Sequence, residues 1–292
     1  MSTTDPIVVT PAVLRDWALP APGSGKEARG RLAVAAGTAT TPGAVLLAGE
    51  AALRAGAGKL ALAVVEPIAV QLGVAVPEAS AARLPSRDGM LAEEAADELA
   101  DRLGQADAAL VGPGFTDPAR SSALLTKVLP HVRTSLVLDG LASAYLTDHP
   151  DGLRHLDGRA VLTVNHTELA RTAGVDEDEL SADPLAPARQ VAQRSQVVVL
   201  CGGAEKHVAA PDGRAWVIQG GGPGLGVSGS GDVQAGIVAG LLARGAEPAQ
   251  AAVWGGYLHA RVGERLAARV GSVGYLAREL APEVPTVLAE LE

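Results

Sequence analysis

Continuous runs of apolar residues alternate along this chain with segments that have a helical pattern of apolar and polar positions. Short apolar runs of this kind are typical of strands buried on both faces of a parallel sheet. They lie at residues 31–36, 59–65, 108–111, 135–138, 160–164 and 196–200. The helical segments between them lie at residues 42–55, 91–103, 118–132 and 184–194. This alternation predicts an α/β fold with a mostly parallel central sheet and helices on both of its faces.

The last third of the chain departs from simple alternation. Pro211-Asp212-Gly213 is a turn signal between apolar runs at 206–210 and 215–218, which predicts a hairpin of two antiparallel strands. Two long helices are then predicted at residues 232–244 and 248–269.

Length and composition indicate how many domains to expect and in which cellular compartment the protein is found. No repeat or low-complexity tract appears in the 292 residues, so we expect a lead-in segment over 1–25 and a single domain over 26–292. The single cysteine, Cys201, excludes an internal disulfide and fits a reducing compartment. The first residues lack the basic and apolar regions of a signal peptide, and no apolar stretch reaches the roughly 18 residues of a membrane span. These features predict a cytoplasmic protein.

The balance of charges limits the classes of partner to expect, and the scarcity of aromatic residues limits which side chains can build the core. With 24 Lys and Arg against 33 Asp and Glu, the formal net charge is -9. Nucleic acids and anionic membranes attract clustered Lys and Arg, so neither is expected as a partner. Aromatic residues make up only 2% of a chain that is 48% apolar, so Ala, Val and Leu must build the core.

The richest glycine cluster runs from Gly220 to Asp232 and leads directly into an apolar helix. Glycines let the backbone approach a ligand closely, and a helix start offers unpaired N–H groups and the positive end of the helix dipole. In open α/β sheets, ligands bind beyond the carboxyl ends of the strands, where such clusters fall. The cluster therefore predicts a site for an anion, most often a phosphate.

Asp232, at the start of this helix, has two interpretations. Asp is a common helix N-cap, which would make the residue structural. However, a cap needs only one residue and not a cluster of nearby glycines, and a carboxylate beside a phosphate would be repelled by it. We therefore favour a general base that takes the proton of a hydroxyl attacking phosphorus.

Other motifs indicate no further chemistry. Gly224-Leu225-Gly226-Val227-Ser228-Gly229 matches G-x-G-x-x-G, but it follows the predicted hairpin, whereas a dinucleotide fingerprint lies in the first turn of a βαβ unit. The six histidines do not have the spacing of metal ligands, so a structural zinc is not expected. The sequence identifies no residues that would bind any other metal. Cys201 ends an apolar run and is interpreted as a small buried thiol and not a nucleophile.

Gly229-Ser230-Gly231-Asp232 and the apolar helix that follows resemble the anion-hole signature of ribokinase-like enzymes. More narrowly, the chain resembles the ADP/ATP-dependent NAD(P)H-hydrate dehydratases of the carbohydrate-kinase-related family, from about Lys26 to Glu283. The order and spacing of several blocks carry this resemblance: Pro42–Ala48, Arg54–Gly58, Gly112-Pro113-Gly114, Val137-Leu138-Asp139, Val161-Leu162-Thr163 with Glu168, Tyr257-Leu258-His259 and Gly271–Leu276.

The resemblance implies a reaction. Members of this family use ADP or ATP, with Mg²⁺, to dehydrate the S epimer of hydrated NADH or NADPH. The hydroxyl on the damaged nicotinamide ring is phosphorylated, and elimination of phosphate restores the double bond. The resemblance also implies a homo-oligomer.

The resemblance further assigns roles by position. Asp232 matches the base, which also contacts the substrate. Ala44 and Gly114 match residues that line the hydrated-nicotinamide site, and Asn165 and His166 stand where the family has a histidine. The nucleotide site matches two segments, formed by Cys201, Gly202, Gly203, Ala204 and Glu205 and by Gly229, Ser230 and Gly231.

Two alternatives remain open at this stage. The glycine–aspartate motif also fits a small-molecule kinase of the same fold. The family's nucleotide segment usually opens with Lys and continues Gly-Ala-x-Thr, whereas Cys201 and Glu205 stand at the Lys and Thr positions here. These two exchanges predict weak ADP and ATP binding, and they favour a degenerate, non-catalytic nucleotide-binding protein as the second alternative.

Overall fold

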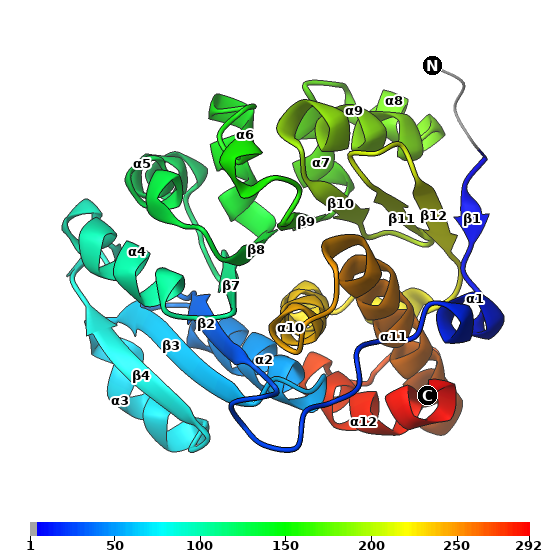
Figure 1. Cartoon of the computed structure of the whole chain (residues 1–292), viewed down its shortest axis with the longest axis horizontal. Helices are drawn as coiled ribbons and strands as arrows, with labels where there is room; N and C mark the ends of the chain where they lie inside the picture. Colours follow the sequence, from blue (N-terminus) through cyan, green and yellow to red (C-terminus); the bar gives the residue numbers. More distant parts are fainter. Residues whose placement is uncertain (1–4) are drawn as a thin grey trace.

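A ten-stranded central sheet organises the molecule (Figure 1). The computed structural model describes residues 5–292. The strands pair in parallel except for β11, which is antiparallel to both neighbours, as the predicted hairpin requires. The structure thus confirms the predicted fold class. In sheet order the strands are β1 (Ile7–Val8), β12 (Ala215–Ile218), β11 (Lys206–Ala209), β10 (Val198–Cys201), β9 (Ala160–Val164), β8 (Ser135–Asp139), β7 (Ala108–Val111), β2 (Arg31–Ala35), β3 (Lys59–Val65) and β4 (Ala79–Leu84).

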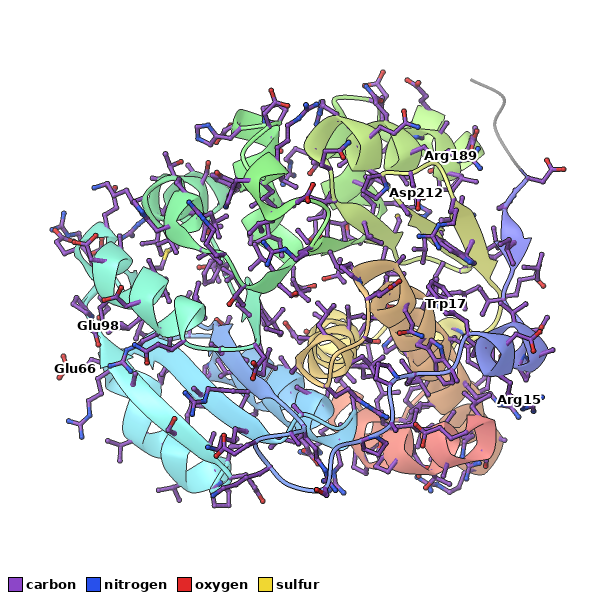
Figure 2. All side chains as sticks on the ribbon, in the orientation of Figure 1. Arg15, Trp17, Glu66, Glu98, Arg189 and Asp212 are labelled. Atoms are coloured by element: carbon purple, nitrogen blue, oxygen red, sulfur yellow. The ribbon has the colours of Figure 1, made fainter. Side chains whose placement is uncertain are left out.

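Helices cover both faces of this sheet and complete three layers (Figure 1). One face carries α2 (Pro42–Arg54), α3 (Glu66–Ala75), α10 (Ser230–Ala243), α11 (Pro248–Arg269) and α12 (Leu280–Leu291). The opposite face carries α4 (Ala96–Gly104), α5 (Pro118–Val128), α6 (Ala144–Asp148), α7 (His166–Ala173), α8 (Glu177–Ala182) and α9 (Leu185–Ser195). Polar side chains such as Glu98 point from the outer surfaces of these helices to solvent (Figure 2). Among the helices of residues 5–292, none combines the length and the apolar composition of a membrane span.

Helix α10 lies at the centre of its layer, between α2, α11 and strands β7 and β8. Nearly all its residues are buried, which explains why its sequence is apolar all round. Gly236 and Gly240 face α2, where a Cβ atom would collide with the backbone carbonyls of Ala48 and Ala52. The two glycines therefore allow close helix packing, which fixes the start of α10 at the carboxyl ends of the central strands.

Part of the predicted lead-in segment belongs to the sheet edge. Strand β1 pairs with β12, and α1 (Pro11–Asp16) follows it. The ring of Trp17, a residue labelled in Figure 2, stacks on the Trp216 ring with the ring centroids 5.6 Å apart. The backbone carbonyl of Trp17 accepts hydrogen bonds from the Gln250 and Trp254 side chains. Residues 1–4 lie outside the described residues, and the predicted boundary at residue 25 stays a prediction.

Some elements that the sequence prediction omitted or misplaced have weak patterns, whereas α3, α7 and α12 were omitted although they are helices of 8 to 12 residues. Strand β4 reads Ala-Ser-Ala-Ala-Arg-Leu and lies at the sheet edge with little burial, so it lacks a continuous apolar run. The helix predicted at 91–103 starts late, because residues 90–91 form β6 against β5 (Ser86–Arg87) and a 3₁₀ turn precedes α4. The helix predicted at 118–132 ends at Val128 and continues as a 3₁₀ turn over Leu129–His131.

Candidate active site

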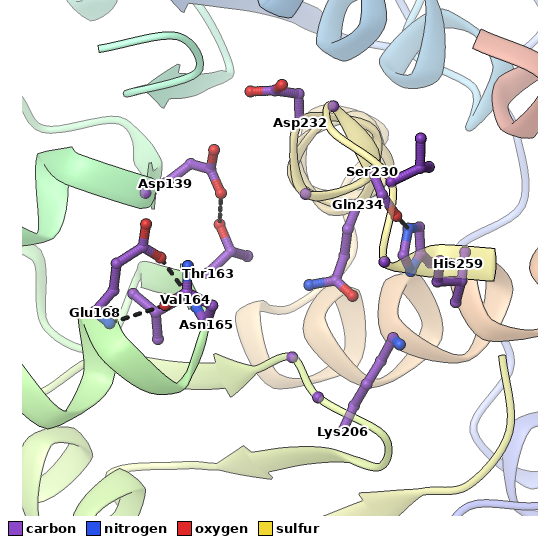
Figure 3. Close-up of a pocket in the computed structure, with 18 of the residues that line it drawn as sticks. Asp139, Thr163, Val164, Asn165, Glu168, Lys206, Ser230, Asp232, Gln234 and His259 are labelled. Carbon is purple, nitrogen blue, oxygen red and sulfur yellow. Dashed lines mark hydrogen bonds between the residues drawn. The ribbon is translucent and has the colours of Figure 1, made fainter. Parts of the chain in front are cut away.

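A cavity of about 900 Å³ opens at the carboxyl ends of β7, β8, β9 and β10 (Figure 3). The residues that follow these strands line it, together with the glycine-rich segment before α10 and the first residues of that helix. Parallel strands bring their carboxyl ends to one edge, which is where open α/β sheets bind ligands. The predicted glycine cluster therefore lies at the edge of the sheet where such folds bind ligands.

The start of α10 is built to receive an anion. Gly229 is the N-cap residue in the left-handed region, at φ 91°, and a Cβ atom there would collide with the Leu47 side chain. Within the described chain, the N–H groups of Gly231 and Asp232 donate no hydrogen bond, because the first intrahelical bond joins the Val233 N–H to the Gly229 carbonyl. These free N–H groups and the helix dipole face the cavity and favour negative charge.

Asp232 is the third residue of α10 and not its N-cap, so the capping interpretation of this residue is wrong. Its carboxylate lies at the cavity, half-buried. Burial and, next, the charge of Glu168 raise the pKa of Asp232 to about 6, while the backbone of Gly114 lowers it. A carboxylate with this pKa is ionised at neutral pH and is still basic enough to accept a proton efficiently.

Asp139 is the last residue of β8 and projects into the same cavity (Figure 3). Its side chain accepts a hydrogen bond from Thr163 Oγ1 at 2.7 Å. Burial and, to a smaller extent, the charge of Asp232 hold the pKa of Asp139 well above its usual range. The two carboxyl groups therefore disfavour simultaneous ionisation.

Glu168 is the third carboxyl group of the cavity, and a capping box orients it. Asn165 is the N-cap of α7: its Oδ1 accepts from the Glu168 N–H, and Glu168 Oε2 accepts from the Asn165 N–H, both at 2.9 Å. Burial raises the pKa of Glu168. Asn165 lines the cavity, whereas His166 does not; its ring lies against Gly203.

Only part of the predicted nucleotide segment after β10 lines the cavity. Gly202, Gly203 and Ala204 line the cavity. Cys201 is fully buried, and burial raises the pKa of its thiol to about 12, which keeps it neutral. Glu205 is exposed, and its Oε1 accepts a hydrogen bond from Gln219 Nε2 at 3.1 Å, outside the cavity lining.

The predicted hydrated-nicotinamide residues meet at the start of α2. Gly114 lines the cavity, with φ 72°, and Ala44 of α2 packs directly behind it. The Thr41 hydroxyl donates to the Gly114 carbonyl at 2.6 Å, which fixes this loop against the start of α2. Ala44 itself does not line the cavity.

The cavity brings Ser230, which the sequence assigned to the nucleotide site, together with polar side chains that received no role from the sequence. Ser230 Oγ and His259 Nε2 are hydrogen-bonded at 2.9 Å, and Gln234 and Lys206 lie beside them (Figure 3). Asp139 could have been found, since it directly follows a predicted strand. Lys206 and Gln234 stand inside a predicted strand and a predicted helix and gave no signal of their own, and His259 appeared only within the Tyr257-Leu258-His259 block, with no role attached to it.

The fold and the site together define an α/β protein with an anion site facing an aspartate. A structure of a ribokinase-like superfamily protein from Enterococcus faecalis shares this fold, with a TM-score of 0.82 at 23% identity over 98% of this chain and 96% of that one. A sequence model described as NAD(P)H-hydrate dehydratase matches residues 32–286. The chain therefore belongs to the NAD(P)H-hydrate dehydratase family.

Individual relatives agree with this membership. The chain is 44% identical to the ADP-dependent (S)-NAD(P)H-hydrate dehydratase of Xanthomonas campestris, over 97% of this chain and 96% of that protein. The ADP/ATP-dependent NAD(P)H-hydrate dehydratase of Bacillus subtilis, co-crystallised with ATP and Mg²⁺, matches with a TM-score of 0.82 at 26% identity and covers 99% of both chains. The chain spans about half the length of several bifunctional NAD(P)H-hydrate repair enzymes that it also matches, including the Escherichia coli enzyme at 49%.

Proposed function

We propose that this protein dehydrates the S epimer of hydrated NADH or NADPH at the expense of ADP or ATP. The observation that carries the proposal is the position of the Asp232 carboxylate beside the free N–H groups of α10, inside one cavity. Family membership supplies the substrate class, and the relatives named above support the nucleotide.

In the first step, Asp232 takes the proton of the substrate hydroxyl while that oxygen attacks the terminal phosphorus of the nucleotide. The new phosphorus–oxygen bond forms as the bond between the terminal phosphorus and the rest of the nucleotide breaks, which releases AMP from ADP or ADP from ATP. The N–H groups of Gly231 and Asp232 stabilise the charge on the transferred phosphoryl group. A pKa of about 6 suits Asp232 to this role at neutral pH.

In the second step, the phosphate leaves with the electron pair of its carbon–oxygen bond. A proton passes from the adjacent ring carbon to water, and the electron pair of that carbon–hydrogen bond forms the double bond that restores NADH or NADPH. Phosphate is a far better leaving group than hydroxide, which is the chemical reason for consuming a nucleotide. The net reaction releases one phosphate for each dinucleotide repaired.

The donor chemistry of the cavity fits Mg²⁺. Within residues 5–292, no three His, Cys, Asp or Glu side chains converge closely enough to hold a metal by themselves. Mg²⁺ characteristically uses one or two carboxylates together with phosphate oxygens and water. Asp139 and Glu168, which line the cavity, would provide these carboxylates. When bound, Mg²⁺ neutralises phosphate charge that these carboxylates would otherwise repel.

Hydrated NADH distinguishes this proposal from the two alternatives. The purified protein is incubated with the S epimer and either ADP or ATP, and the NADH absorbance is followed. We expect the absorbance to return only when nucleotide is present. A protein that binds nucleotide but never restores NADH would be a kinase for another alcohol or a non-catalytic binder, and the proposal would be wrong.

A further inference from the structure

Lys206 is a buried lysine on the wall of the active-site cavity. It is the first residue of β11 and follows directly on the predicted nucleotide segment. Its side chain lines the cavity and is only 2% exposed. Figure 3 shows it extending toward Gln234 and His259, away from Asp139 and Glu168.

Lys206 has no counter-ion in the part of the chain that the structure describes. No hydrogen bond or ion pair is made by its ammonium group there. The neighbouring Glu205 is turned outward to Gln219. Burial lowers the pKa of Lys206 to about 8, so the group is still mostly charged at neutral pH. A buried charge without a partner is costly, and proteins rarely retain one that no ligand compensates.

The neighbours of Lys206 leave room for an anion. His259 is buried, and burial together with the charge of Lys206 holds its pKa well below the usual range, so the ring is neutral. Its Nδ1 atom has no partner among the described residues. Gln234 is the other polar neighbour, and neither it nor neutral histidine can balance the ammonium charge. The free N–H groups at the start of α10 face the same cavity.

We propose that Lys206 binds a non-transferred phosphate of the nucleotide, while the start of α10 holds the transferred phosphoryl group. The proposal rests on the function proposed above for this cavity. It assigns the positive charge at the nucleotide phosphates to β11, since the neutral, fully buried Cys201 at the end of β10 cannot supply one. Lys206 would then select phosphorylated nucleotides over nucleosides.

Calorimetric titration of the Lys206→Met variant tests this assignment. Methionine keeps an unbranched apolar stem but removes the charge. We expect ADP to bind about tenfold to hundredfold more weakly, as for a lost hydrogen bond between charged groups. Adenosine, which lacks phosphate, should bind as it does to the wild type. The KM for ADP should rise by a similar factor, with the KM for hydrated NADH unchanged.

A matched control is Lys26→Met, which removes an exposed lysine outside the cavity and should leave ADP affinity unchanged. The thermal unfolding midpoint of unliganded Lys206→Met should not fall, because an unpaired buried charge has been removed. ADP affinity within twofold of the wild type, or an equal loss of ADP and adenosine affinity, would overturn the proposal. If Lys206→Met does not fold, Lys206→Gln takes its place in the same titrations. A wild type that binds ADP but restores no NADH would refute the proposed function alone.

Discussion

The two sides of the active-site cavity respond to burial in opposite ways. On one side, Asp139, Glu168 and Asp232 are carboxyl groups whose pKa values burial raises. On the other side, burial lowers the pKa values of Lys206 and His259. In both cases the low-dielectric surroundings disfavour the charged form. On the first side Asp232 is thereby suited to accept a proton, and on the second side Lys206 is suited to receive an anion as its missing partner.

Asp232→Asn should have the largest effect of any single change. Asparagine keeps the shape of the side chain but cannot accept the substrate proton, so turnover should fall about 10²–10⁴-fold. ADP affinity should be nearly unchanged, because the N–H groups and Lys206 remain. Initial rates with hydrated NADH and calorimetric ADP titrations measure both, with the exposed Asp101→Asn as control. Near-wild-type turnover would show that Asp232 is not the general base.

Glu168→Gln should move the acidic limb of the pH–rate profile, which is recorded at saturating Mg²⁺ because Glu168 is also a proposed Mg²⁺ ligand. Because Asp232 works as a base only when ionised and its pKa is raised to about 6, the wild-type rate should fall as the pH drops through about 6. Removing the like charge of Glu168 lowers the pKa of Asp232, so the limb should shift to lower pH. Glutamine still accepts the hydrogen bond from the Asn165 N–H, which preserves the capping box.

The control for this shift is Glu177→Gln, on α8 and outside the cavity lining, which should leave the profile in place. If the acidic limb of the Glu168→Gln profile does not move, or moves to higher pH, then the charge of Glu168 does not raise the pKa of Asp232.

Glu205→Thr should have the smallest effect. The sequence alone predicts that Glu205 weakens nucleotide binding and that Cys201→Lys together with Glu205→Thr strengthens it. In the structure Glu205 is exposed and bonded to Gln219, so its charge is screened by solvent. We therefore expect the ADP dissociation constant to change by less than about twofold. A tenfold gain in affinity would place Glu205 at the phosphates and weaken the case for Lys206.

The sequence predicted the fold through its strongest local signals. Buried strands such as β8 and β9 are continuous apolar runs, and the proline at the start of α2 marks its first turn. Edge elements such as β4 were missed because they are held by pairing with β3 and not by an apolar pattern. The predicted homo-oligomer and cytoplasmic location stay predictions.

The candidate site was predictable only in part, for a similar reason. Asp232 and its glycines form one contiguous motif, which can be read directly. Lys206, Gln234 and His259 come from β11, α10 and α11, and only the packing of these elements brings them to one wall. Whether Glu205 faces the cavity or solvent is likewise decided by the β11–β12 pairing, which places Gln219 beside it.

Stoichiometry tests the central claim most directly. Wild-type protein is incubated with the S epimer of hydrated NADH and ADP, and NADH, phosphate and AMP are quantified in the same samples. The account predicts equal molar amounts of all three, because phosphoryl transfer and phosphate elimination occur once per turnover. Accumulation of a phosphorylated dinucleotide, or formation of NADH without consumption of ADP, would contradict it.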